Sequence, residues 1–415
     1  MAERGADERA FDGIVCMGGQ DWWYHNRGHF DLQILRRLAR KMPVLFINSI
    51  GVRMPSAAEP ALFVARIRRK LKSLARGLVE AEPNFFVYSP FAIPGATGAQ
   101  LSHWALGPQI RIAARRAGIR RPLVWMHCPA GASLIGKLGE AAIVLERTDR
   151  FEAYPEGDPA LIGGQIARLK AAADLVVYCN ADLAEAERHE VRQSLVVDHG
   201  VDLARFAAAG DGSVPTPADL AAIRGPRVGF IGGIDAHTFD PALFRAVAER
   251  LTNVQFVMIG ACSLPEGWCP LANVHLLGRK PYEEVAAYMA AMDCLIMPWN
   301  RSDWIQAANP IKLKEYLAVG RPVVTTEFPA LGPWRDLVSV ATEADSFAAA
   351  IEQALATRFP VQAARRRLMT ETWDIKAAEV LAAIEGLGRA QGVDVNVATA
   401  GEANATAAAR IERAA

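Results

Sequence analysis

The chain has 415 residues, more than a single hydrophobic core normally supports, so we expect two domains. Its 46 basic and 45 acidic residues leave a formal net charge of +1, which argues against a protein that binds nucleic acid through bulk charge. The six cysteines include no C-x-x-C pair, a usage that favours a reducing, cytoplasmic compartment and no structural zinc.

The first half of the chain alternates short apolar runs with longer helical patterns, which predicts an α/β fold with a mainly parallel sheet. The polar N-terminus does not suit a signal peptide. The sequence has no uninterrupted apolar run of about 18 residues, the length that a membrane-spanning helix needs. A helix is predicted over 29–41. The strands predicted in this half cover residues 13–17, 44–49, 124–127, 142–147 and 174–180.

Residues 18–31, between the first strand and its helix, hold more aromatic and polar side chains than a core would use. Aromatic rings stack on sugar faces, and carboxylates and imidazoles bond hydroxyl groups, so this loop is predicted to bind an acceptor. Asp21 and His25 are candidate catalytic bases within it. The loop has no G-x-G-x-x-G or H-E-x-x-H motif, so neither a dinucleotide cofactor nor a metal is predicted. The candidate acceptor-binding residues are Trp22, Trp23, Tyr24 and Arg27.

The segment Ala61 to Val79 carries six basic residues and no acidic one. It is predicted to form an amphipathic helix that suits an anionic membrane surface, which would place the chain peripherally on the inner face of the membrane. The alternative is a solvated basic face packed on the domain. The apolar residues at helical spacing are Ile67, Leu71, Leu74 and Leu78.

The second half repeats the strand and helix alternation after residues 211–226, a Gly- and Pro-rich stretch that we expect to link two domains. An N-terminal domain over 1–210 and a C-terminal domain over 227–360 result. Helices within 361–391 are expected to return to the N-terminal domain, and 392–415 to form a flexible tail. The predicted strands of this half cover residues 227–235, 254–260, 274–278, 294–299 and 322–326.

The strongest local signal is NPIKLKEYLAVGRPVVTT, residues 309–326. Asn309 is predicted to cap a short helix that ends at Gly320. Because this helix follows a strand, its N-terminus should lie at the carboxyl edge of a parallel sheet, where phosphates bind. Lys312 and Glu315 share one face, where they could hold a diphosphate and ribose hydroxyls; the alternative is an ordinary surface ion pair.

This segment resembles the donor-binding segment of GT-B glycosyltransferases, in the broad superfamily that includes retaining family four. DHGVD (198–202) and VGFIGGID (228–235) resemble the turn that ends the N-terminal domain and the first strand with its glycine loop in the C-terminal domain. The resemblance covers about 195–326 and implies two Rossmann-like domains with parallel sheets facing across a cleft. It also implies a metal-independent transfer of a sugar from a nucleotide-diphosphate donor to a glycan or lipid-linked acceptor.

By the same resemblance, the donor would be held by the glycine loop, by the helix after it and by a basic residue near the base. The residues implied are Gly232, Gly233, Arg279, Asn309, Lys312 and Glu315, with Asp235 as a polar candidate beside the glycine loop. Many retaining members carry a second glutamate eight positions before the one matched by Glu315, but Ala307 stands there. The departures fit better with envelope transferases such as those of teichuronic acid or exopolysaccharide assembly, some of which invert the anomeric centre.

Inversion needs a base that takes the proton of the acceptor hydroxyl. Asp149, just beyond the predicted strand 142–147, is the first candidate, with a helix-capping or salt-bridged aspartate as the alternative. His127, at the end of the strand before it, is the second, with a hydrogen-bonded core histidine as the alternative.

Two rival functions share this architecture: a sugar-nucleotide epimerase of the GT-B fold, and a noncatalytic homologue that binds a nucleotide sugar or a glycan. Product analysis distinguishes the epimerase. The binding homologue predicts that Asp149 can be replaced without loss.

Overall fold

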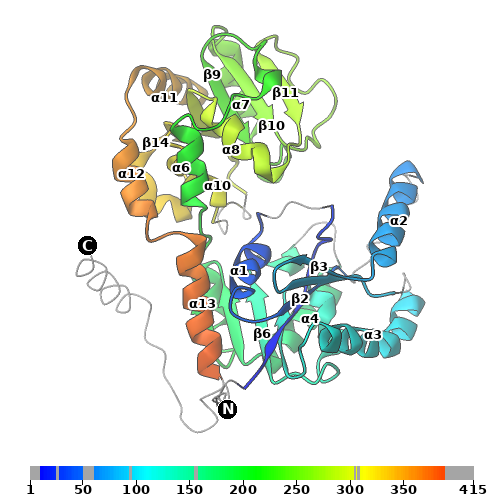
Figure 1. The fold of residues 1–415 in the computed structure, drawn as a ribbon. Helices are drawn as coiled ribbons and strands as arrows, with labels where there is room; N and C mark the ends of the chain where they lie inside the picture. The colour runs from blue at the N-terminus through cyan, green and yellow to red at the C-terminus, as the bar shows by residue number, and fades with distance from the viewer. Residues whose placement is uncertain are drawn as a thin grey trace, which may run out of the picture. The chain divides into compact units, whose positions relative to one another are not determined.

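The computed structural model describes residues 10–24, 28–49, 60–92, 96–153, 158–302, 305 and 309–387. These residues form two compact units, each built on a mainly parallel sheet with helices packed around it (Figure 1). The first unit holds residues 10–24, 35–197 and 377–387, and the second holds 28–34 and 198–376. The predicted α/β class is confirmed, and the predicted tail at 392–415 lies outside the described residues.

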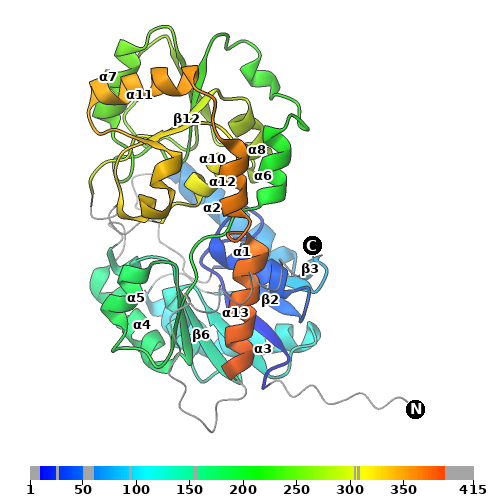
Figure 2. The same ribbon diagram turned by 90° about the vertical axis from the view of Figure 1, so that its left-hand side faces the viewer.

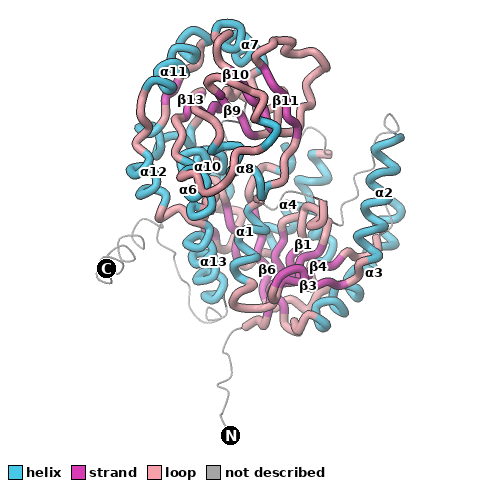
Figure 3. Tube along the Cα trace, turned by 45° about the horizontal axis from the view of Figure 1, so that its top comes forward, coloured by secondary structure: helices cyan, strands magenta, loops and turns pink. Residues whose placement is uncertain are grey.

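The first sheet has eight strands in the order β3-β4-β2-β1-β5-β6-β7-β8, all parallel except the antiparallel pair β3 and β4. Figure 3 shows the strands of this unit in magenta with the helices in cyan. The strands are β1 (Gly13–Met17), β2 (Val44–Ile47), β3 (Leu78–Glu82), β4 (Phe85–Tyr88), β5 (Pro122–Met126), β6 (Ala142–Arg147), β7 (Leu175–Tyr178) and β8 (Ser194–Val196). The helices are α1 (Phe30–Leu38), α2 (Pro60–Ala75), α3 (Ala96–Arg116), α4 (Pro159–Ala172), α5 (Ala181–Glu187) and α13 (Trp373–Leu387), with short 3-10 turns η1 (Pro129–Leu134) and η2 (Phe151–Ala153).

The second sheet has six parallel strands in the order β11-β10-β9-β12-β13-β14. They are β9 (Arg227–Ile231), β10 (Gln255–Ile259), β11 (Val274–Gly278), β12 (Cys294–Met297), β13 (Val323–Thr325) and β14 (Ser339–Val340). The helices of this unit are α6 (Leu203–Gly210), α7 (Pro241–Arg250), α8 (Tyr282–Ala290), α10 (Ile311–Val319), α11 (Ala344–Ala356) and α12 (Val361–Leu368), with 3-10 turns η3 (Ala218–Leu220) and η4 (Pro329–Leu337).

Alternation along the strands of the second sheet divides its interior into two cores. Val257 and Ile259 face the core covered by α6, α8, α10 and α12, which lie together in Figure 2. Phe256 and Met258 face the other core, beneath α7 and α11. Side chains of a strand point alternately to its two faces, so a sheet covered on both sides needs this uninterrupted apolar run.

Both sheets reverse their strand order at the centre. In the first sheet β1 lies between β2 and β5, and in the second β9 lies between β10 and β12. The loops that leave the carboxyl ends of the two central strands therefore diverge, which opens the crevice where α/β proteins bind ligands. Ligand-binding residues are accordingly expected after β1, β5, β9 and β12.

The prediction of a linker at 211–226 is wrong, and so is the prediction of a domain boundary at 210. The division falls after Val197, and residues 211–226 lie inside the second unit. Leu220 and Ile223 are buried in its core with Phe206 of α6. Glycine and proline mark the turns of this stretch, but its two apolar residues are enough to fasten it to the unit that follows.

The basic segment forms a shorter helix than expected. α2 ends at Ala75, and Gly77 adopts a left-handed φ of 64° that stops the helix. Leu78 and Val79 then begin β3 instead of extending the apolar stripe. Leu71, expected on that stripe, is 59% exposed. No helix among the described residues is both long enough and apolar enough to cross a membrane.

An aromatic cluster ties the segment before residue 35 to the second unit. The ring of Phe30 packs edge-on against Trp373 and His199, with centroids 5.9 Å from each. His199 Nδ1 has no hydrogen-bond partner within the described part of the chain. The pKa of His199 is lowered to about 4, mainly by burial and to a smaller extent by Lys314 and His29, while the charge of Asp198 acts in the opposite direction.

We predict that this histidine makes the protein less stable in mild acid. Between pH 6.5 and pH 4, the imidazole is neutral in the folded state but charged in the unfolded state. The contribution of His199 to stability is therefore complete above the ordinary pKa of 6.5 and is lost as the pH falls towards 4. The free energy of unfolding, measured with urea at pH 7 and pH 5, should fall by about 1–2 kcal/mol more in the wild type than in His199→Gln. The exposed His237→Gln is the matched control and should keep the wild-type difference; an unchanged slope in His199→Gln would contradict the assignment.

Candidate functional site

The glycine loop after β9 lies at the centre of the second sheet and depends on a close approach between two backbone segments. Gly232 donates its N–H to Ile259, and Ile234 donates to Ala261. Gly260 has a φ of 152°, and a Cβ there would stand 1.7 Å from the carbonyl oxygen of Gly232. Only glycine permits this contact. Gly260 was missed from the sequence, although it ends a predicted strand in the manner of a turn.

Asp235 shapes the glycine loop from within. Its Oδ1 accepts hydrogen bonds from the backbone N–H groups of His237 and Thr238 and from the Thr238 hydroxyl. Its Oδ2 stands 2.6 Å from the position a Cβ would take on Gly233. The carboxylate therefore acts first on the loop itself, and the prediction that it binds donor remains a prediction.

The loop after β12 is fastened to the glycine loop. Asn300 donates its backbone N–H to the Thr238 carbonyl and its side-chain amide to the Ala236 carbonyl, and the Ser302 hydroxyl donates to the His237 carbonyl. These three hydrogen bonds hold the two loops together at the point where the strand order reverses. Helix α10 is bonded to the end of β9, just before the glycine loop, because the Tyr316 hydroxyl accepts from the N–H of Ile231 at 2.8 Å.

Helix α10 begins one residue later than expected. Pro310 has extended dihedral angles and is the capping position, so Asn309 lies before the helix and is not its N-cap. The predicted stop is confirmed: Gly320 is left-handed, with φ 82°, and its N–H bonds the carbonyls of Tyr316 and Leu317. A proline side chain has no oxygen, so the capping position itself satisfies none of the N–H groups in the first turn of α10.

The first turns of α10 present a buried carboxylate. Glu315 is fully buried, its Oε2 lies 2.7 Å from Lys312 Nζ, and its Oε1 accepts from the Tyr282 hydroxyl at 3.4 Å. The Lys312 side chain is 24% exposed. An ordinary surface ion pair is therefore excluded for Glu315, because a buried carboxylate requires such partners.

A second lysine on α10 secures the helix to the turn that opens this unit. Lys314 is 2% exposed and donates to Asp198, the His199 carbonyl and Glu371, each at 2.6 Å. Lys376 pairs with the same two carboxylates. Burial raises the pKa of Asp198, but the two ammonium groups outweigh it and hold that pKa below its usual range. Arg279, by contrast, is exposed after β11.

In the first unit, His127 lies at the other reversal point, just beyond β5. Its Nδ1 is 2.8 Å from Oε1 of Glu146, and Trp125 Nε1 donates to the other oxygen of that carboxylate at 2.6 Å. Glu146 is fully buried, while the His127 side chain keeps 14% of its surface exposed. Gly19, in the loop after β1, approaches the opposite edge of the ring, where a Cβ would stand 3.0 Å from Nε2.

Glu146 and Trp125 were missed because β6 and β5 read as apolar strands. The alternation of the sheet places Glu146 on the neighbouring strand opposite the histidine, which only the pairing of β5 with β6 reveals. With Glu146 accepting Nδ1–H, Nε2 carries the lone pair and can accept a proton.

The aromatic loop after β1 divides between core and surface. Trp22 is 3% exposed and packs against Phe85 and Phe46, with ring centroids 4.8 and 6.3 Å away. The prediction that Trp22 binds the acceptor is wrong, because its ring is enclosed. Trp23 and Tyr24 are partly exposed; Arg69 of α2 lies over the ring of Tyr24, and Arg76, just after α2, lies over the ring of Trp23.

Asp21 is engaged with α2. Its Oδ2 accepts from the hydroxyl of Ser73 at 2.8 Å, and its Oδ1 accepts from the N–H of Trp23. These bonds anchor α2 to the loop after β1 and make Asp21 a poorer base than His127. The other candidates from this loop, His25 and Arg27, lie outside the described residues.

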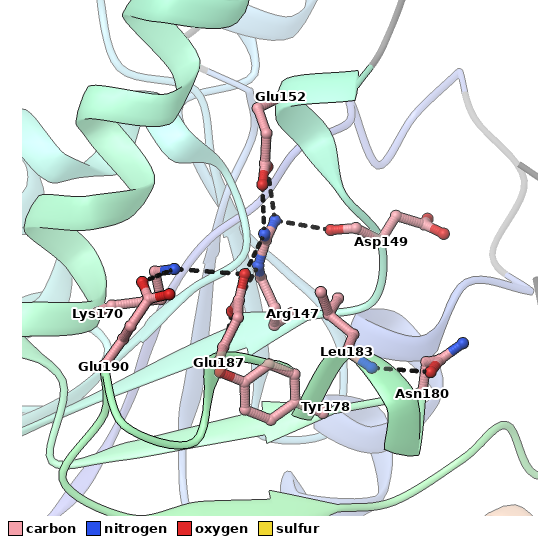
Figure 4. A network of polar contacts seen from close by, with 9 residues as sticks. All are labelled: Arg147, Asp149, Glu152, Lys170, Tyr178, Asn180, Leu183, Glu187 and Glu190. Carbon is pink, nitrogen blue, oxygen red and sulfur yellow. Dashed lines mark hydrogen bonds and ion pairs between the residues drawn. The ribbon is translucent and has the colours of Figure 1, made fainter. Parts of the chain in front are cut away.

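Asp149 follows β6 in a loop that a buried arginine holds in place (Figure 4). Arg147 is fully buried and donates to both oxygens of Glu152, to Glu187 and to the Asp149 carbonyl. The Asp149 carboxylate points away from this network in Figure 4. The bond that Arg147 donates here goes to the Asp149 backbone carbonyl, at 2.8 Å.

The network also sets the charge of its carboxylates and the position of a neighbouring ring. Burial raises the pKa of Glu187, but hydrogen bonds from Arg147 and the charge of Lys170 outweigh it, so that pKa is lowered. Phe151, in the turn that Arg147 secures, packs edge-on against His127 at 5.7 Å between centroids. Within the described residues, no group of three or more His, Cys, Asp or Glu side chains is placed to hold a metal ion.

Part of the sequence is similar to known glycosyltransferases. Residues 225–357 match the family model of glycosyl transferases group 1. A Bacillus subtilis (strain 168) protein, TuaH, whose name assigns it to teichuronic acid biosynthesis as a glycosyltransferase, is 32% identical over 139 residues. That match covers 32% of this chain and 34% of TuaH, so it spans about a third of either protein.

Solved structures match nearly the whole chain. Sucrose-phosphate synthase from Thermosynechococcus elongatus has a TM-score of 0.66 at 15% identity, covering 92% of this chain and 100% of its own. Anabaena Alr3699/HepE in complex with UDP and glucose has a TM-score of 0.58 at 14% identity, with 90% and 98% covered. E. coli trehalose-6-phosphate protein bound with UDP-2-fluoro glucose has a TM-score of 0.60 at 12% identity, with 90% and 99% covered. The predicted GT-B fold and the resemblance to GT-B glycosyltransferases are confirmed.

We predict that Gly260→Ala disrupts the glycine loop. The added methyl group would meet the Gly232 carbonyl at 1.7 Å, and the backbone angle is one that alanine rarely adopts. Urea unfolding should show a loss of more than about 2 kcal/mol. Gly332→Ala is the control, since nothing lies within 4 Å of its Cβ position. Equal stability of the two variants would show that the backbone contact is not obligatory.

We predict that Arg147→Met is severely destabilising, because it removes the buried cation that Glu152 and Glu187 share and leaves Glu187 with Lys170 as its remaining cation. The expected loss is about 3–5 kcal/mol in urea unfolding. Arg192→Met is the matched control, because Arg192 pairs with Asp174 on the surface and should cost no more than about 1 kcal/mol. A similar small loss in both variants would contradict a structural role for the buried network.

Proposed function

We propose that this chain, which has the GT-B fold and a group 1 glycosyl transferase segment at 225–357, is a glycosyltransferase that uses a nucleotide-diphosphate sugar. The observation that carries the proposal is the pair Lys312 and Glu315 at the start of α10, beside the glycine loop at the reversal point of the second sheet. Because two structural relatives are described with UDP or a UDP-sugar, we propose a UDP-sugar as the first donor to test.

On this proposal, the donor diphosphate meets the backbone N–H groups at the start of α10 and the ammonium group of Lys312. Lys312 now neutralises Glu315, and a diphosphate would compete for that ammonium group. The released Glu315 oxygen would accept hydrogen bonds from ribose hydroxyls. Gly232 and Gly233 would let the sugar or phosphate approach the backbone, with Arg279 near the base.

We propose His127 as the general base, in preference to Asp149. As the acceptor oxygen forms its bond to the anomeric carbon, the bond from that carbon to the diphosphate breaks, and the hydroxyl proton moves to His127 Nε2. Glu146 would hold the ring through Nδ1–H and stabilise the imidazolium that results. Asp149 remains the alternative base, since its carboxylate points away from the Arg147 network. This route inverts the anomeric centre.

We propose that the acceptor is a glycan or a lipid-linked sugar in envelope or exopolysaccharide synthesis, bound in the first unit with Trp23 and Tyr24. The partial similarity to TuaH supports the envelope role. A cytoplasmic chain bound peripherally to the inner face of the membrane would fit this work. Four of the cysteines are buried free thiols, as a reducing compartment permits. The exposed Arg68, Leu71 and Lys72 of α2 support a contact with anionic lipid.

The proposal is tested first at the donor site, by calorimetric titration with UDP-, GDP- and dTDP-sugars. We expect one donor family to bind the wild type and Glu315→Gln to bind it at least about tenfold more weakly, because a charge-assisted hydrogen bond is lost. Glu327→Gln, which alters an exposed carboxylate paired with Arg335, is the control and should bind normally. If no nucleotide sugar binds the wild type, the donor site is wrongly assigned.

The same donor then tests the base. His127→Ala should keep donor affinity and lose roughly 10²–10⁴-fold in transfer to the acceptor. Glu146→Gln should lose less and shift the pH profile of turnover. Isomerised donor without a transfer product would indicate the epimerase, and binding without any product in the wild type would indicate the noncatalytic homologue. Full activity of His127→Ala would return Asp149 to first place.

A further inference from the structure

The exposed face of α3 is unusually apolar for a helix on the surface of a protein. Trp104 is 81% exposed and Ile112 is 53% exposed, with the exposed Pro108 between them at the same helical spacing. The opposite side of the helix is buried through Leu106 and Ile110. Since the helix already has a buried face, these outward residues need another explanation.

A further exposed apolar side chain is held beside α3 by a residue of the helix. Phe91 is 60% exposed, and Gln109 of α3 fixes its backbone in both directions, accepting from its N–H at 2.9 Å and donating to its carbonyl at 3.2 Å. The loop beyond β4 is thereby fastened to α3 with a phenylalanine ring facing outward.

Arginines flank the apolar stripe. Arg111 and Arg115 are exposed along one side of it, and Arg116 follows Ile112 at the same helical spacing, at the end of the helix. The sequence from 83 to 139 contains no Asp or Glu and six Lys or Arg residues. The face formed by α3 and Phe91 thus combines aromatic and aliphatic side chains with positive charge and has no acidic residue of its own.

Helix α2 lies on the same side of the first unit as α3 in Figures 1 and 3. It adds the exposed apolar residue Leu71 and the exposed basic residues Arg68 and Lys72. Its other side is anchored to the loop after β1 through Ser73 and Asp21. Two basic helices with outward apolar residues therefore belong to one side of one unit.

We propose that the face of α3 with Phe91 is a docking surface for an anionic lipid bilayer, with Trp104 as its main inserted side chain and α2 as a second basic contact. Tryptophan prefers the interface between headgroups and acyl chains, and arginines beside it meet anionic headgroups. A second copy of the chain would bring two positive faces together, which opposes pairing. Nucleic acid offers phosphate but no apolar phase for Ile112 and Phe91.

The test uses the full chain without donor, so its result is independent of the proposed reaction. Cosedimentation is measured with vesicles of phosphatidylcholine containing 30% phosphatidylglycerol and with vesicles of phosphatidylcholine alone. We expect binding to the anionic vesicles that weakens with salt, and a loss of roughly 30-fold in Arg111→Gln/Arg115→Gln, about fivefold for each arginine. Brominated lipids should quench the fluorescence of the wild type more strongly than that of Trp104→Phe.

Trp104→Ser should bind the anionic vesicles at least tenfold more weakly than the wild type. Leu161→Ser is its matched control, because Leu161 is another exposed apolar residue, 59% exposed, on α4 of the same unit. The proposal is overturned if the wild type does not bind the anionic vesicles, if Trp104→Ser binds as well as Leu161→Ser, or if Trp104→Ser instead abolishes self-association or oligonucleotide binding.

Discussion

The reversal of strand order at the centre of each sheet is the constraint on which both candidate sites depend. In the second sheet, the loops that follow β9 and β12 are bonded to each other where the strand order reverses, and Tyr316 of α10 is bonded to the end of β9. In the first sheet, the same arrangement of β1 and β5 places Gly19 beside His127. Residues far apart in sequence become neighbours because parallel strands end on a common edge.

Buried charge fixes the loops around these points. In the second unit, Lys314 draws Asp198 and Glu371 onto α10, and in the first unit, Arg147 draws Glu152 and Glu187 around the turn that carries Asp149. A buried cation with carboxylate partners is a poor source of net stability, but the removal of one partner is costly. Such networks therefore specify one arrangement of a loop, which a site that must present a carboxylate or an imidazole requires.

The first unit carries both the candidate acceptor loop after β1 and the exposed basic and apolar residues of α2 and α3. The loop after β1 contacts α2 through Asp21 with Ser73 and through Tyr24 with Arg69, so a candidate acceptor residue and the basic helix are in direct contact. A lipid-linked acceptor and a bilayer-docking face on the same unit would make sense of that connection. The exposed Trp104 and Phe91 extend the same side with apolar contacts that α2 by itself does not supply.

The sequence by itself determined the α/β class, most of the strands, the stop of α10 at Gly320 and the placement of Lys312 and Glu315 on one face of that helix. These depend on apolar periodicity, on a left-handed glycine and on spacing within one helix, all of which are local. Only the tertiary structure decided that Trp22 is core, that residues 211–226 belong to the second unit and that Glu146 orients His127. Each of these depends on which strands are neighbours and which faces are covered, and a chain segment read alone does not contain that information.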